Sequence, residues 1–512
     1  MSKEDTIAII DFGGQYAHLI GRRIRELGVK TLVIPYDRLD MAVGENVRGW
    51  ILSGGPASVY NDGSPRISLD TLSQQPVLGI CYGLQLIVHS LGGVVRRATK
   101  REYGRTQLQI VGGSPLFHGL PEKFWIWMSH SDHVESLPEG FKVLGSTESS
   151  PYAAVVSLDQ RLYGVQFHPE VSNTEYGDRI LENFVYGICG CNPSWRMEDY
   201  LERAVGEVAA KVGDGRVLCA LSGGIDSTVT ALLVKKAVGG RLTCVFVNHG
   251  LLRKGEADEI LEILQKRLGL ENLLYVDASE RFLSKLKGVK DPEEKRRIIG
   301  REFIEIFREV DMTNGPFQFL AQGTLYPDVI ESGRSGGPAS RIKSHHNVAG
   351  LPESHGFQLL EPLRELYKDE VRKLAAILGV PEELTARHPF PGPGLAARII
   401  GEVTPEKLYI CREASAIVEE ELKKAGLYGM LWQAFAVVGD DLATGVMGDE
   451  RKTGHIVIVR AVTSRDAMTA DWARIPHEVL DNISRRITNE VEGVTWVAYA
   501  ISGKPPSTIE PQ

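Results

Sequence analysis

Long hydrophobic segments, regularly spaced cysteines and an excess of positive charge are all missing from this sequence of 512 residues. No apolar run approaches the roughly 20 residues that a membrane-spanning helix needs, and the six cysteines do not have the spacing of a disulfide framework. The formal net charge of -8 argues against a main partner with a nucleic-acid backbone. We therefore expect a cytoplasmic, reduced protein with neither membrane nor nucleic acid among its partners.

A Walker A motif, G-x-x-x-x-G-K-[ST], is also absent, and this removes the main support for a kinase or GTPase of the P-loop type. The start of the sequence shows no apolar stretch typical of a signal peptide. Hydrophobic residues make up 43% and charged residues 24%, so the chain is expected to fold. At about 150 residues per domain, its length predicts roughly three domains.

The pattern of strands and helices predicts two successive doubly wound, mostly parallel α/β domains followed by a small α+β domain. Short β-branched runs such as Thr6–Asp11 and Lys30–Pro35 alternate with helical patterns such as Tyr16–Leu27, as in parallel α/β units. A second α/β series begins after a helix at Met197–Val212, and a long helix at Pro405–Lys424 marks the last domain. The expected domains are residues 1–192, 193–387 and 388–512.

The first motif that carries chemistry is Gly79-x-Cys81-x-Gly83, which follows the apolar strand Val77–Ile80 and precedes a helical pattern. This is the pattern of a nucleophile elbow, with cysteine in place of serine. A thiol at the N-terminus of a helix has its thiolate favoured by the helix dipole. The alternative is a buried cysteine that only packs beside a tight turn, so a base is needed to support the functional interpretation.

Val165-Gln-Phe-His168-Pro-Glu170 supplies the candidate base. If a strand carries His168 and Glu170, its period of two sends both side chains to the same face. His168 could then take the proton of Cys81 while Glu170 orients the imidazole.

A cysteine followed far downstream by His-x-Glu resembles the class I glutamine amidotransferases, and the likeness extends to the loop Leu52-Ser-Gly-Gly-Pro56. The resemblance implies Cys81, His168 and Glu170 as catalytic residues. It also implies an oxyanion hole from the backbone N–H groups of Gly54, Gly55 and Tyr82. The implied reaction releases ammonia from glutamine through a γ-glutamyl thioester.

The second motif follows a buried strand at Arg216–Leu221 and precedes the helical pattern Val229–Val238. Its two glycines let backbone N–H groups approach phosphate oxygens at a helix N-terminus, which predicts an anion site. The motif S-G-G-x-D-S resembles that of the N-type ATP pyrophosphatases. That resemblance implies Mg²⁺ held in part by Asp226, and a lid that brings Lys343 over ATP. The residues it assigns to ATP are Ser222, Gly223, Gly224, Ile225, Asp226, Ser227, Thr228 and Lys343.

An amidotransferase of the Cys-His-Glu kind joined to this pyrophosphatase resembles the GMP synthetase family over essentially the whole chain. The resemblance implies xanthosine monophosphate (XMP), ATP and glutamine as substrates, an ammonia path between the two sites, and a homodimer formed by the C-terminal domain. The residues it assigns to XMP are Arg253, Asp328, Gln433, Lys504, Ile509 and Glu510. The chain ends Glu510-Pro-Gln512 where family members commonly end Glu-Trp-Glu, so roles of the last two residues are not transferred.

Two alternatives remain open on the sequence alone. One is an enzyme of the same chemistry with another carbonyl acceptor, such as a tRNA-modifying ligase, against which the acidic composition counts. The other is a nucleotide-binding scaffold without catalysis, which the intact set of Cys81, His168 and Glu170 disfavours.

Overall fold

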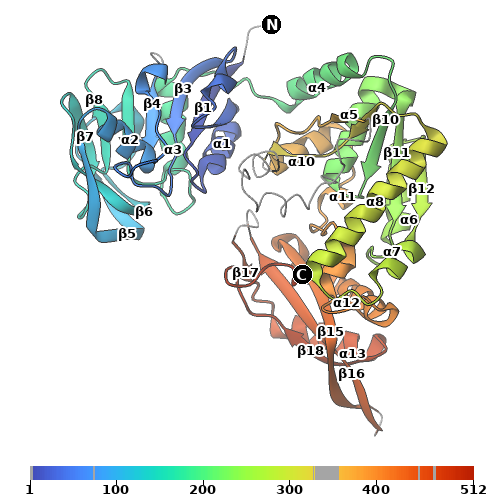
Figure 1. Ribbon diagram of the computed structural model, residues 1–512. Coiled ribbons are helices and arrows are strands. Elements are labelled where there is room, and N and C mark those ends of the chain that lie inside the picture. The colour runs from blue at the N-terminus through green and yellow to red at the C-terminus, as the bar shows by residue number, and fades with distance from the viewer. Residues whose placement is uncertain (1–3, 73–74, 327, 329–356, 448–449, 465–468) are drawn as a thin grey trace. The chain divides into compact units, whose positions relative to one another are not determined.

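The computed structural model describes residues 4–72, 75–326, 328, 357–447, 450–464 and 469–512. The chain forms two compact units, Met1–Asp199 and Tyr200–Gln512. The second unit contains two separate sheets (Figure 1). The three-domain boundaries expected after residues 192 and 387 stay predictions.

The first unit is built on a nine-stranded sheet with the order β2-β1-β3-β4-β9-β8-β7-β5-β6. The strands from β2 to β9 in this order pair in parallel, and the remaining pairs are antiparallel. The strands are β1 (Asp5–Asp11), β2 (Lys30–Pro35), β3 (Asn46–Leu52), β4 (Val77–Ile80), β5 (Val94–Ile110), β6 (Lys123–Ser136), β7 (Phe141–Ser146), β8 (Ala154–Ser157) and β9 (Leu162–Val165). The helices are α1 (Ala17–Glu26), α2 (Tyr82–Ser90) and α3 (Gly177–Glu182).

Strand β4 lies at the centre of this sheet, and each of its residues is buried. A fully apolar strand of this kind is expected where both faces of the sheet are covered by other parts of the protein. Helix α2 packs on β4 and β9. The carboxyl ends of these two parallel strands therefore lie beside the N-terminus of α2.

The second unit begins with a five-stranded parallel sheet of order β12-β11-β10-β13-β14. Its strands are β10 (Val217–Leu221), β11 (Leu242–Asn248), β12 (Leu273–Asp277), β13 (Phe319–Ala321) and β14 (Gln358–Leu360). Its helices are α5 (Ile225–Val238), α6 (Glu256–Glu262), α7 (Ser279–Leu286), α8 (Pro292–Asn314), α10 (Lys368–Ile377) and α11 (Glu382–Thr385), and α4 (Met197–Val212) connects the units. Helix α5 packs against β10, β11 and β13.

A smaller sheet completes the second unit, and α12 and α13 lie beside it (Figure 1). Strand β16 pairs with β15 and β17 in antiparallel fashion and with β18 in parallel. Thr404 caps α12 by accepting a hydrogen bond from Lys407 N, with Pro405 in the first turn. The elements are α12 (Pro405–Lys424), α13 (His477–Glu490), β15 (Gln433–Met447), β16 (Glu450–Thr463), β17 (Asp471–Trp472) and β18 (Val494–Tyr499).

One continuous hydrophobic core joins the two sheets of the second unit, running from Leu218 and Val245 of the parallel sheet to Val438 and Val457 of the smaller one. The predicted α/β fold class, with mostly parallel sheets and a C-terminal α+β part, is confirmed. None of the helices in the described ranges is long and apolar enough to cross a membrane.

Candidate active sites

Cys81 occupies the turn between β4 and α2. Its backbone has φ 52° and ψ -104°, and a positive φ is uncommon for a residue with a side chain. The turn needs glycines on both sides, because a Cβ on Gly79 would lie 2.6 Å from the carbonyl carbon of Gly83, and one on Gly83 would lie 2.2 Å from the carbonyl oxygen of Leu52. The predicted strand-turn-helix geometry is confirmed, while the reactivity of Cys81 stays a prediction.

His168 and Glu170 lie just beyond β9, which ends at Val165. The expectation that one strand carries both residues is wrong, because both ladder partners of Val165 are the ends of their own strands, Ile80 of β4 and Ala154 of β8. The side chains meet through the turn instead. Nδ1 of His168 lies 2.7 Å from Oε1 of Glu170, and both residues are buried.

The charge of Glu170 controls the protonation of His168. Burial disfavours the charged imidazolium, but the negative charge of Glu170 and hydrogen bonds with Cys81 and Glu170 outweigh burial and raise the pKa of His168 to about 10. The imidazole therefore carries a second proton at neutral pH. A protonated ring beside a thiolate is the arrangement in which sulfur serves as nucleophile and the ring as proton donor.

Several residues that the sequence did not single out hold this pair in place. Thr174 donates from Oγ1 to the carbonyl oxygen of His168 at 2.6 Å, and Arg23 donates from Nε to the carbonyl oxygen of Glu170 at 3.1 Å. The ring of Tyr16 stands edge-on to His168 with centroids 5.0 Å apart. Nε2 of Gln166 lies 3.7 Å from Sγ of Cys81. No local motif marks these residues, because each belongs to the site only through the fold.

The predicted oxyanion-hole residues lie next to Cys81 and His168. A Cβ on Gly54 would lie 3.1 Å from Cε1 of His168 and 3.8 Å from Cβ of Cys81. A Cβ on Gly55 would lie 3.4 Å from Cγ of Tyr82, which is the first residue of α2. The loop thus approaches Cys81 as closely as its glycines allow, and its role as an oxyanion hole stays a prediction.

The Ser-Gly-Gly loop connects β10 to α5, as the second motif predicted. Gly223 has φ 76°, and Gly224 is the N-cap of α5. The hydroxyl groups of Ser227 and Thr228 both donate to the carbonyl oxygen of Gly224, at 3.1 and 2.9 Å. Helix α5 begins at Ile225 rather than near Val229, so the whole second half of the motif forms the first helical turn. Ser222 precedes this turn, and Asp226 is its second residue.

Asp226, the expected Mg²⁺ ligand, is paired with a lysine that the sequence did not single out. Nζ of Lys368, the first residue of α10, lies 2.6 and 2.5 Å from the two carboxylate oxygens of Asp226. Gly323 packs against the same residue, since a Cβ there would lie 3.1 Å from Cβ of Asp226. The described residues hold no group of three metal-ligating side chains.

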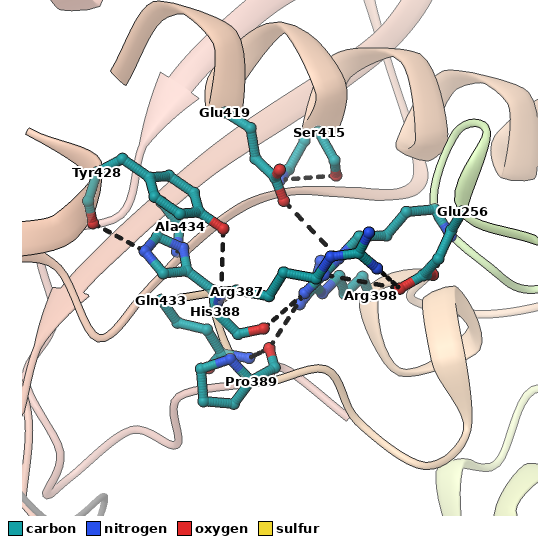
Figure 2. A network of polar contacts seen from close by, with 12 residues as sticks. Glu256, Arg387, His388, Pro389, Arg398, Ser415, Glu419, Tyr428, Gln433 and Ala434 are labelled. Atoms are coloured by element: carbon teal, nitrogen blue, oxygen red, sulfur yellow. Dashed lines mark hydrogen bonds and ion pairs between the residues drawn. The ribbon is translucent and has the colours of Figure 1, made fainter. Parts of the chain in front are cut away.

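Two of the six expected XMP residues bond one carbonyl group, that of Pro389, and a third bonds one of those two; Figure 2 shows Pro389 with Gln433. Nε2 of Gln433 donates to the carbonyl oxygen of Pro389 at 2.8 Å and to Oε1 of Glu510 at 2.7 Å. Nη2 of Arg253 reaches the same carbonyl oxygen at 3.5 Å and that of His388 at 2.8 Å. Gln433, Glu510 and Arg253 therefore form one polar cluster although they are far apart in the sequence.

Two buried arginines that the sequence did not single out organise the end of the chain. Arg398 donates to both carboxylate oxygens of Glu510, at 3.2 and 3.1 Å. Arg460 donates to the carbonyl oxygen of Ile509 at 2.8 Å. Ile509 itself packs in a small hydrophobic cluster, and the backbone of Lys504 pairs with Ala470.

Asp328 and Lys343 are not joined to this cluster by the structure. Asp328 accepts a hydrogen bond from the backbone N–H of Leu325 at 2.9 Å, and within the described ranges it bonds none of the other expected XMP residues. Lys343 lies outside the described residues, as does the loop 333–352 that was expected to close over ATP.

Two family models match separate parts of the chain. Residues 8–188 match the family model "Glutamine amidotransferase class-I", and residues 420–511 match "GMP synthase C terminal domain". The first region contains Cys81, His168 and Glu170, and the second contains Gln433, Ile509 and Glu510, whereas Arg253 and Arg398 lie outside both.

Relatives described as GMP synthase (glutamine-hydrolyzing) match along nearly the whole chain. The protein from Carboxydothermus hydrogenoformans is 54% identical over 506 residues, which is 98% of this chain and 99% of the relative. The one from Alkaliphilus metalliredigens is 54% identical over 510 residues, covering 99% of each chain. The one from Caldanaerobacter subterraneus subsp. tengcongensis is 52% identical over 510 residues, again covering 99% of each. The chain belongs to the glutamine-hydrolysing GMP synthase family.

Proposed function

We propose that this protein is a ligase that converts XMP, ATP, glutamine and water to GMP, AMP, pyrophosphate and glutamate. The observation that carries the proposal is identity above half along nearly the full length of glutamine-hydrolysing GMP synthases. The contact between His168 and Glu170 beside Cys81 supports the glutamine-hydrolysing half.

In the first half-reaction, the proton of the Cys81 thiol resides on His168, and the thiolate sulfur attacks the side-chain amide carbon of glutamine. His168 gives its proton to the departing ammonia, and Glu170 keeps the imidazole charged and oriented. Backbone N–H groups of Gly54, Gly55 and Tyr82 stabilise the tetrahedral oxyanion. Water then hydrolyses the γ-glutamyl thioester to glutamate and restores the thiol.

In the second half-reaction, the C2 carbonyl oxygen of XMP attacks the α-phosphate of ATP, and pyrophosphate leaves. Ammonia then attacks C2, and AMP leaves with the former carbonyl oxygen. Backbone N–H groups at the start of α5 bind phosphate oxygens, and Lys343 and Lys368 supply positive charge as pyrophosphate departs.

Mg²⁺ fits this site because Asp226 presents a partly exposed carboxylate beside the phosphate-binding turn, and the cation prefers carboxylate and phosphate oxygens. Asp226 would hold the ion, which would neutralise charge on the phosphates. The protein's own part is to present that carboxylate and to move Lys368 from it to the phosphates.

The XMP site is proposed around Arg253, Gln433 and Glu510, with Asp328, Lys504 and Ile509 completing it. The buried amide of Gln433 and the half-buried carboxylate of Glu510 are groups suited to reading the polar edge of a purine. Lys504 suits the phosphate of the nucleotide because of its positive charge.

The two half-reactions are proposed to be coupled. Free ammonia would be protonated or lost, so glutamine hydrolysis is expected to stay weak until ATP and XMP occupy the second site. Full glutaminase turnover without these ligands would refute the coupling.

A cytoplasmic homodimer is the proposed form of the protein. Exposed apolar side chains lie on β15, on β18 and just after β18, namely Leu442, Val446, Trp496 and Ile501, and such side chains favour association. All six cysteines are unpaired, as is typical of a reducing compartment. Light scattering of native protein and Trp496→Glu would test the dimer.

The deciding experiment measures GMP and AMP formation from XMP and Mg-ATP, with glutamine or ammonium as nitrogen donor. We expect native protein to use both donors and Cys81→Ala to use ammonium alone. If ATP is converted to AMP and pyrophosphate but no GMP forms with either donor, the acceptor is a different carbonyl compound.

A further inference from the structure

His388 lies at the centre of the polar cluster in Figure 2 and uses every polar atom it has. Its backbone N donates to Oη of Tyr428 at 3.1 Å, and its carbonyl oxygen accepts from Nη2 of Arg253 at 2.8 Å. Nε2 lies 2.9 Å from the carbonyl oxygen of Tyr428, and the backbone N of Ala434 lies 3.2 Å from Nδ1. The ring stacks on that of Tyr428, with centroids 3.7 Å apart and an interplanar angle of 13°.

These contacts determine the protonation state of the imidazole. A backbone N–H only donates, so Nδ1 of His388 must accept from Ala434 and carry no proton. A backbone carbonyl only accepts, so Nε2 must carry the proton that it gives to Tyr428. The cluster is therefore complete only with the neutral Nε2–H tautomer, and a second proton would break the bond with Ala434.

Two contacts of His388 lead to residues of the proposed XMP site, and the others fix the ring against Tyr428. Ala434 follows Gln433 in β15, so the bond to Nδ1 fixes the strand end from which Gln433 projects. The next carbonyl along the chain, that of Pro389, accepts from Gln433 at 2.8 Å. Arg253 comes from the loop before α6, and the carbonyl of His388 is its shortest hydrogen bond from Nη2.

We propose that His388 is a positioning residue for the XMP site, which as the neutral Nε2–H tautomer holds Arg253 and Gln433 in the arrangement that binds the nucleotide. The inference rests on the proposed function, since it assigns XMP to this cluster. His388 does not touch the nucleotide itself; it acts through the backbone of Ala434 and Pro389 and through the side chain of Arg253.

The positive charge of Arg253 beside His388 is compensated by nearby carboxylates. His388 therefore contributes by orienting Arg253, not by adding charge. The guanidinium of Arg253 lies 3.7 Å from Glu256 and 3.7 Å from Glu419 of α12. It also lies over the ring of Phe390 at 4.5 Å. The ionisable groups that face His388 are Glu419 on α12, Arg253 before α6, Arg398 in the turn after Pro393, and Tyr428.

Two variants each keep half of the imidazole's hydrogen bonding. His388→Asn can accept near the position of Nδ1 but cannot reach the carbonyl of Tyr428, and His388→Gln can donate near Nε2 but cannot accept from Ala434. His455→Asn is the matched control. His455 is a buried histidine of β16, the strand that pairs with β15, and it bonds one backbone carbonyl, that of Gly439, at 3.0 Å. His455 lies away from the XMP cluster, because Gln433 pairs with Val462, which is seven residues along β16 from His455.

The measurement is GMP formation with saturating ammonium, so that the glutamine site does not contribute. We expect both His388 variants to raise KM for XMP about tenfold, with KM for ATP changed less than twofold and His455→Asn changing neither selectively. Equal rises in both KM values, or an unchanged KM for XMP, would overturn the proposal. If native protein makes no GMP at all, the proposed function fails instead.

The pH dependence separates positioning from general stability. Burial lowers the pKa of His388 from its usual 6.5, so the neutral form is lost only as pH falls below that value. We expect the ratio of KM for XMP between His388→Asn and native protein to fall towards one under acidic conditions, since the ionisation of XMP itself cancels in the ratio. A ratio independent of pH would contradict the tautomer requirement.

Tyr428→Phe tests the proposal without touching the histidine, should the His388 variants fail to fold. The variant keeps the stacked ring and the carbonyl acceptor but removes Oη, the acceptor for the backbone N of His388. We expect KM for XMP to rise about threefold with KM for ATP unchanged. An unchanged KM for XMP would count against the positioning role of His388.

Discussion

Lys368 forms an ion pair with both carboxylate oxygens of Asp226, with its Nζ 2.6 Å from Oδ1 and 2.5 Å from Oδ2. The lysine begins α10 and the aspartate lies in the first turn of α5, 142 residues earlier. The carboxylate expected to hold Mg²⁺ is thus already neutralised by a protein cation. If Asp226 holds Mg²⁺ as proposed, the metal would replace this lysine, and the ammonium group would become free for phosphate oxygens.

Lys368→Met is therefore expected to raise KM for Mg-ATP about tenfold, because it removes one charge-assisted contact with the phosphates. Steady-state kinetics with ammonium as nitrogen donor measures the change. Lys373→Met, an exposed lysine on the same helix, is the control and should leave KM for Mg-ATP unaltered. A lowered KM in Lys368→Met would mean that the lysine only blocks the metal.

The protonation of His168 predicts an alkaline limit to glutamine hydrolysis. With its pKa raised to about 10, the ring holds its second proton across the neutral range and loses it as pH rises through that value. We expect kcat/KM for glutamine, with ATP and XMP saturating, to fall above about pH 9 with an apparent pKa near 10. Glu170→Gln removes the charge that raises the pKa, so the limit should move to lower pH. An unmoved limit in Glu170→Gln would assign it to another group.

Crowding at the turn around Cys81 predicts the effect of a single methyl group. A Cβ on Gly83 would lie 2.2 Å from the carbonyl oxygen of Leu52, so Gly83→Ala must displace backbone. We expect a loss of about 2 kcal/mol or more in the stability of the first unit, together with loss of glutaminase activity. Gly113→Ala is the control, because its Cβ would meet nothing within 4 Å; thermal unfolding should be nearly unchanged there. Equal melting temperatures for the two variants would contradict the prediction.

The buried Lys295 predicts that the stability of the second unit rises with pH. Its ammonium group donates to the carbonyl oxygen of Ile399 at 2.8 Å and to Oε1 of Gln512 at 2.5 Å, and burial lowers its pKa from 10.5 to about 8. Between these values the unfolded chain binds the proton and the folded chain does not, so stability rises with pH. Denaturant unfolding from pH 7.5 to 10.5 should show this rise in native protein relative to Lys295→Met. A difference that is flat or falls with pH would show that Lys295 stays charged in the fold.

The elements that depend on local pattern could be predicted from the sequence. The helices Met197–Val212 and Pro405–Lys424 and the strands Lys30–Pro35 and Val77–Ile80 have the expected bounds, because apolar spacing, Pro405 and the glycine turns are visible in a short window. Both glycine-containing turns and their positions before helices were also predictable, since tight turns restrict the residue types they accept. The strand expected under His168 was wrong because a strand ends where its neighbours end, which no window around His168 contains.

By itself, the sequence determined the chemistry that the protein carries: a thiol in a strained turn, a histidine with a carboxylate two residues on, and a glycine loop at a helix N-terminus. Only the tertiary structure decided which side chains complete these sites. Lys368 reaches Asp226, and Arg398 reaches Glu510, across more than a hundred residues of chain. Local periodicity specifies the elements, whereas such contacts depend on how the elements pack.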